Sequence, residues 1–193
     1  MTDDQVQPGS LAEWREWLAQ NHGRGAGVWL VTWRAGSSGP RISYVESVEQ
    51  ALCFGWVDSK GRSLDDERTM LWFAPRKRGS GWARTNKERV ERLTAAGLMT
   101  SAGLAVIEAA KADGSWTLLD DVENLVVPDD LAAAFAADPP AREHWDAFPR
   151  SARRAILEWI ATAKRAETRA KRVAEAATKA QVNERANEWR PKS

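Results

Sequence analysis

The chain has 193 residues, enough for one domain with a sizeable core or for a domain of about 115 residues followed by a small satellite. Its 28 Lys and Arg residues balance its 27 Asp and Glu residues, so the total charge does not indicate a surface tuned as a whole to nucleic acid or membrane. The single cysteine excludes an intrachain disulfide framework and a cysteine-based zinc cluster.

The sequence carries no pattern of export or membrane insertion. No window approaches the ~20 apolar residues that a membrane span requires. The first residues, MTDDQVQPGS, are acidic and polar, whereas a secretory signal combines a basic region with an apolar run. We therefore expect a cytoplasmic protein.

Three capping boxes predict where helices begin in the first half of the chain. In each, a Ser or Thr and the Glu three residues later satisfy backbone amides that a helix start leaves unpaired. Apolar residues then recur at helical spacing, and a glycine follows the end of each helix. The predicted N-caps are Ser10, Ser43 and Thr85, and a further helix is expected at 100–113.

Short runs of β-branched and aromatic residues predict three strands, at 27–34, 56–62 and 68–75. The last two form a hairpin, because the acids of LDDE between them suit a turn. In a strand, side chains alternate between the two faces of the sheet. Trp56 and Asp58 should therefore share one face.

Beyond about residue 117 the composition changes to Ala-rich segments separated by prolines, which predicts short helices. We therefore expect an α+β protein: a small antiparallel sheet covered by helices at 1–117, a helical satellite domain at 118–180, and a polar tail at 181–193. The acidic stretch 120–146 is followed by a basic helix at 164–172. Contact between these two segments would account for both charge blocks.

The candidate site surrounds the hairpin. An indole and a carboxylate project side by side from its first strand, and cations follow the end of its second. The next helix then begins, and unpaired amides at a helix start favour an anion. The predicted ligand-binding residues are Trp56, Asp58, Ser59, Arg76, Lys77, Trp82, Asn86 and Lys87. The alternative interpretation is a solvated basic loop beside core tryptophans, with Asp58 paired to an arginine.

The sequence leaves two other functions open. Nucleic acid could bind the basic segments 76–92 and 164–172. Trp29, Trp33 and Trp72 could stack bases, although we favour indoles that fill the space between sheet and helices. An enzyme would use Asp58 as its acid or base. No nucleophile motif, metal-ligand spacing or phosphate-binding loop is present, so neither catalytic residues nor a cofactor is expected.

Several stretches together resemble the YdeI/OmpD-associated (bacteriocin-protection) family. They cover most of residues 11–175 in the family's order, and the run from ALCFGWVDS through PRKRGSGW to NKERVERL is the most specific. The others include GVWLVTWR, VPDDLAAAF and ILEWIATAKRAETRAKRV. The family motif positions that occur here are Gly55, Trp56, Asp58, Ser59, Pro75, Arg76, Lys77, Trp82 and Asn86. The chain departs little from the family pattern, although its longer Gly/Ser loop at 36–39 and its polar tail have no assigned role.

The resemblance implies a small bacterial protein whose helical end is similar to the family's OmpD-associated domain. It also implies a role in protection against bacteriocins or antimicrobial peptides and in envelope stress. We therefore expect a cytoplasmic stress-protection binding protein whose partner is an anionic or amphipathic small ligand or peptide. The alternatives are the nucleic-acid-binding protein and the enzyme described above.

Overall fold

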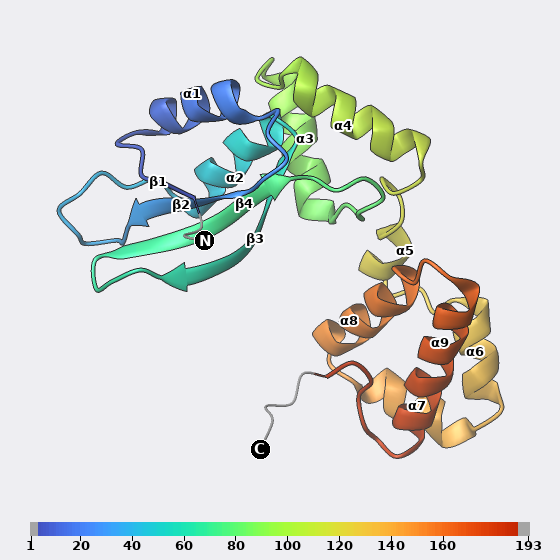
Figure 1. The fold of residues 1–193 in the computed structure, drawn as a ribbon. Coiled ribbons are helices and arrows are strands. Elements are labelled where there is room, and N and C mark those ends of the chain that lie inside the picture. Colours follow the sequence, from blue (N-terminus) through green and yellow to red (C-terminus); the bar gives the residue numbers. More distant parts are fainter. Residues whose placement is uncertain (1–3, 189–193) are drawn as a thin grey trace. The chain divides into compact units, whose positions relative to one another are not determined.

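The computed structural model describes residues 4–188 and divides them into two compact units (Figure 1). The first unit comprises residues 4–80 and 85–115, and the second comprises residues 81–84 and 116–188. The first unit contains a sheet and the second is helical, so the chain has the predicted α+β class.

The sheet of the first unit has four strands in the order β1-β2-β4-β3. The strands β2 (Val28–Trp33), β4 (Arg68–Pro75) and β3 (Trp56–Ser63) are antiparallel, as predicted. The strand β1 (Gln5–Val6) was not predicted, and it pairs parallel with β2. The sheet is therefore mixed. The strand β1 escaped prediction because it has two residues in a polar segment, which is too short to show a strand pattern.

The register of β2 and β4 assigns every side chain of the two strands to one of two faces. Leu30 pairs with Leu71 on one face, and Trp29 pairs with Trp72 on the other. The helices α1 (Leu11–Asn21) and α2 (Tyr44–Cys53) cover the leucine face. There the fully buried Trp14 of α1 contacts Phe73 of β4, with 5.3 Å between ring centroids.

Two of the three predicted helix starts have the expected caps. At α2, Ser43 accepts the amide of Glu46, and the Glu46 carboxylate accepts the amide of Ser43 at 3.0 Å, which completes the capping box. At α1, Ser10 accepts the amide of Glu13, whose carboxylate binds the amide of Gly9 instead. These bonds fix the first turns of the helices that cover the sheet.

The third predicted cap is wrong. The helix α3 runs over Arg84–Ala95, so Thr85 lies inside its first turn. The helix α4 (Ser101–Ala112) begins at the predicted place, and Thr100 caps it by accepting the amide of Gly103. The Thr100 hydroxyl also donates to the carbonyl of Cys53 at 2.6 Å, which ties the start of α4 to the end of α2.

The second unit consists of helices around its own core. They are α5 (Asp120–Glu123), α6 (Asp129–Ala136), α7 (Pro139–Ala147), α8 (Arg150–Ala161) and α9 (Ala166–Gln181). Leu131, Phe135 and Trp145 are buried in this core, and so is Ala186, which lies beyond the last helix. Packing therefore continues into the segment that was predicted to be a polar tail.

The predicted contact between the acidic stretch and the basic helix is present within the second unit. Nε of Arg169 lies 2.7 Å from Oδ2 of Asp130. Lys171 pairs with Glu167 on its own helix at 2.8 Å. Part of the basic charge at 164–172 is therefore neutralised within the chain.

None of the helices described at 4–188 is both long and apolar enough to cross a membrane.

The close approach of α4 to α2 predicts the effect of one substitution. A Cβ added at Gly103 would lie 2.3 Å from the backbone oxygen of Cys53, which neither helix can avoid without moving. Gly103→Ala should therefore lower the free energy of unfolding by ~1–3 kcal/mol, although alanine favours a helix by about 1 kcal/mol. Urea unfolding followed by circular dichroism measures this change.

Gly25→Ala is the control, because a Cβ at Gly25 meets no atom within 4 Å. An unchanged unfolding midpoint for Gly103→Ala would contradict the packing of α4 described here.

Candidate functional site

A cavity of about 400 Å³ lies on the helix-covered face of the sheet. It is bounded by three strands, by the loop that precedes α2 and by the first turn of α2. The described residues that line it are Leu30, Thr32, Trp33, Arg34, Ala35, Arg41, Ile42, Tyr44, Ser47, Gly61, Thr69, Met70 and Leu71. Its size falls within the roughly 300–1,000 Å³ of small-molecule sites.

A β-bulge in β3 shapes one wall of this cavity. Asp58 pairs with Phe73 and Gly61 with Leu71, so two residues of β3 lie opposite Trp72. The extra residue turns Gly61 toward the cavity. Because glycine has no side chain, the space beside Leu71 stays open.

The charge of the cavity is positive. Arg34 and Arg41 are exposed cations at its edge, and none of the described residues that line it is an acid. The apolar part includes Leu30 and Leu71, and hydroxyl groups come from Thr32, Ser47, Tyr44 and Thr69. Apolar walls with a few polar groups and a net positive charge suit a ligand that is both apolar and anionic.

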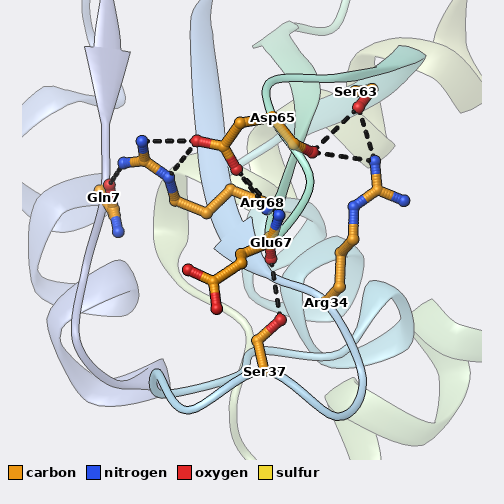
Figure 2. A network of polar contacts seen from close by, with 7 residues as sticks. All are labelled: Gln7, Arg34, Ser37, Ser63, Asp65, Glu67 and Arg68. Carbon is orange, nitrogen blue, oxygen red and sulfur yellow. Dashed lines mark hydrogen bonds and ion pairs between the residues drawn. The ribbon is translucent and has the colours of Figure 1, made fainter.

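A network of polar contacts at the hairpin turn holds Arg34 in place (Figure 2). Its guanidinium donates to the hydroxyl of Ser63 at 2.6 Å and to the carbonyl of Asp65 at 3.4 Å. The Asp65 carboxylate binds Arg68, which in turn donates to the side chain of Gln7. Asp65 of the predicted turn therefore orders the hairpin end that borders the cavity.

Tyr44, at the start of α2, links the cavity to the predicted site. Its hydroxyl donates to Oδ2 of Asp58 at 3.0 Å. Burial raises the pKa of Tyr44, and the hydrogen bond and the negative charge of Asp58 raise it further, while Arg89 opposes them. The Tyr44 phenol therefore stays neutral up to a higher pH than an ordinary tyrosine does.

Arg76 follows the last pairing of β4 and is half-buried. Burial lowers the pKa of its guanidinium to about 10, and attraction to Asp58 opposes this shift. A group with this pKa remains positively charged near neutral pH. On α3, Nη1 of Arg89 donates to Oδ1 of Asn86 at 2.8 Å.

The structure therefore brings part of the predicted set into one polar cluster. Asp58, Arg76 and Asn86 were predicted, and Tyr44 and Arg89 were missed. Tyr44 is the only tyrosine of the chain and lies next to a helix cap, which is the one signal that could have drawn attention to it. No comparable signal in the sequence marks Arg34 and Arg41 at the cavity edge, because residues 34–42 form no recognised motif.

Both predicted indoles are buried, so they fill cores instead of offering contact area to a ligand. Trp56 is 1% exposed, donates its indole N–H to the carbonyl of His22 at 3.0 Å, and meets the ring of Trp17 edge-on. Trp82 is 2% exposed and belongs to the second unit, where its ring lies 4.9 Å from that of Trp116. The alternative interpretation of core tryptophans describes both residues.

None of the eight residues predicted to bind a ligand lines the cavity itself. Ser59 and Lys77 are exposed and Lys87 is half-buried, and their part in ligand binding stays a prediction. An acid or base role of Asp58 also stays a prediction. Within residues 4–188, no group of three or more His, Cys, Asp and Glu side chains is arranged to hold a metal ion.

Two families match the chain. Residues 6–106 match the family described as a domain of unknown function (DUF8412), and this range contains the cavity and the polar cluster. Residues 124–183 match the family described as "Bacteriocin-protection, YdeI or OmpD-Associated", which is the family that the sequence motifs resemble. No curated protein and no solved structure matches the chain.

The single tyrosine makes the polar cluster measurable. Tyrosinate absorbance in an alkaline titration reports Tyr44 alone, and its pKa should lie above the ordinary value of about 10. Asp58→Asn should lower this pKa, because it removes a negative charge and weakens a hydrogen bond to the neutral phenol. The pKa should stay above the ordinary value, because burial remains.

Asp66→Asn is the matched control, since Asp66 lies in the exposed turn of the hairpin. Equal pKa values for Tyr44 in the Asp58→Asn and Asp66→Asn variants would show that Asp58 does not act on Tyr44.

Proposed function

We propose that this chain, which belongs to the family described as a domain of unknown function (DUF8412), is a stress-protection binding protein whose first unit holds an anionic or amphipathic ligand. The match at residues 124–183 associates the chain with bacteriocin protection. The ligand is a small molecule or a peptide segment in the cavity beside Tyr44. The proposed place of action is the cytoplasm.

The charge of the cavity supports this ligand class most directly. Arg34 is held by neutral acceptors, so its charge is not cancelled by a bound carboxylate. Arg41 is exposed, and no carboxylate of the described residues forms an ion pair with it. A carboxylate or sulfonate between these two arginines would gain charge-assisted hydrogen bonds.

The apolar part of the same cavity supports an amphipathic ligand over a small hydrophilic anion. Leu71 is half-buried and pairs with the buried Leu30, and the buried Ile42 also lines the cavity. A ligand with an apolar body would remove the exposed part of Leu71 from water, at about 25 cal/mol per Å². Its anionic group would remain at the arginines.

Anilinonaphthalene sulfonate is a suitable probe, because it joins an aromatic body to a sulfonate. We expect its fluorescence to rise on binding to the full chain. Arg41→Gln should weaken binding roughly tenfold, since a hydrogen bond to a charged group contributes about 1.5 kcal/mol. A fluorescence titration of both proteins measures the change.

Arg142→Gln is the matched control, because Arg142 is exposed on α7 and its ion pair with Asp146 lies within one helix. Equal affinities for the wild type, Arg41→Gln and Arg142→Gln would place the dye elsewhere, for instance in the apolar cavity beside Leu157 and Ile160.

The biological role has its own test. A bacteriocin-sensitive bacterial host that expresses the wild-type chain should survive bacteriocin better than the host with an empty vector. Arg41→Gln should lose most of this protection while remaining folded, because the role requires an occupied cavity. Equal protection by both proteins would separate the protective role from the cavity.

A further inference from the structure

The face of the sheet opposite α1 and α2 carries a layer of tryptophans and cations, which we call the tryptophan–cation face. It is formed by Trp29, Trp33, Lys60, Arg62, Arg68 and Trp72. Trp29 and Trp72 are cross-strand neighbours, and their rings meet edge-on at 5.3 Å. Together with Val31 and Met70 they form a hydrophobic cluster of their own.

Cationic side chains cover these rings. The guanidinium carbon of Arg62 lies 4.4 Å from the centre of the Trp29 ring. Nζ of Lys60 lies 5.4 Å from the centre of the Trp29 ring and 5.8 Å from the centre of the Trp72 ring. The charged ends of the two cations therefore lie over the indole rings as cation–π contacts.

The two central cations of this face are not neutralised. Lys60 and Arg62 are exposed, and neither forms an ion pair with a carboxylate of residues 4–188. Arg62 instead donates from Nε to the sulfur of Met70 at 2.9 Å. Arg68, at the end of the face, is already paired with Asp65. The strands therefore present free positive charge beside the half-buried ring of Trp72, while Trp29 is buried beneath the cations.

We propose that the tryptophan–cation face binds single-stranded nucleic acid. Lys60 and Arg62 would bind phosphates, while the half-buried ring of Trp72 and the planar guanidinium of Arg62 would stack on unpaired bases. An acidic peptide would use the cations alone and would leave the aromatic surfaces unmatched. A duplex keeps its bases stacked inside the helix, so they could not stack on the aromatic surfaces either.

The test uses a fluorescein-labelled oligothymidine of about 15 nucleotides, a length within the site sizes of single-strand-binding modules. The full chain should bind it, and affinity should fall as salt rises. Lys60→Gln/Arg62→Gln should reduce the slope of log affinity against log salt by about 1.4, because each phosphate contact on a single strand contributes about 0.7. Trp72→Ala should weaken binding about 5- to 150-fold, whereas Trp72→Phe retains an aromatic surface and should weaken it less.

Lys164→Gln/Arg165→Gln is the matched control, because it removes the same charge from two exposed residues of the basic segment 164–172, outside the tryptophan–cation face. It should leave binding unchanged.

The proposal is overturned if the wild type fails to bind at low salt, if the control variant loses binding while Lys60→Gln/Arg62→Gln keeps it, or if duplex DNA or polyglutamate competes as well as the single strand. Lys60 and Arg62 lie outside the cavity beside Tyr44, so dye binding there should persist in their double variant.

Discussion

The alternation of side chains along β2 and β4 is the constraint on which the rest of the first unit depends. Once Leu30 lies opposite Leu71, Trp29 must lie opposite Trp72 on the other face. The leucine face is covered by α1 and α2 and leaves a cavity where α2 begins. The tryptophan face is covered by cationic side chains instead. One register therefore gives the sheet an apolar, partly open side and an aromatic, positively charged side.

The β-bulge between Asp58 and Gly61 determines which side chains of β3 face each side of the sheet. Before the bulge, Asp58 faces the helices and meets Tyr44. An uninterrupted strand would also turn Lys60 and Arg62 toward the helices, where two more cations would crowd the cavity. The extra residue turns Gly61 to the cavity and Arg62 to the tryptophans, so a single irregularity separates a carboxylate site from a cation layer.

The sequence predicted the elements that carry strong local signals. The capping box at Ser43 and the left-handed glycine at Gly55, with a φ of 77°, have short-range causes that a sequence displays directly. The strand β1 was missed because its two residues are stabilised by pairing with β2, not by their own pattern. The burial of Trp56 was missed for a related reason. Alternation gives a shared face for Trp56 and Asp58, but it does not say that α1 covers one end of that face.

The central claim is that the ligand site of the first unit is the cavity where α2 begins, beside the Tyr44–Asp58 hydrogen bond. Backbone amide chemical shifts of the full chain, recorded by nuclear magnetic resonance with and without anilinonaphthalene sulfonate, test it most directly. The account predicts that the largest changes occur at cavity residues such as Thr32, Arg41 and Thr69. The account would be contradicted if the largest chemical-shift changes occurred at residues 116–188 while the shifts of the cavity amides stayed unchanged.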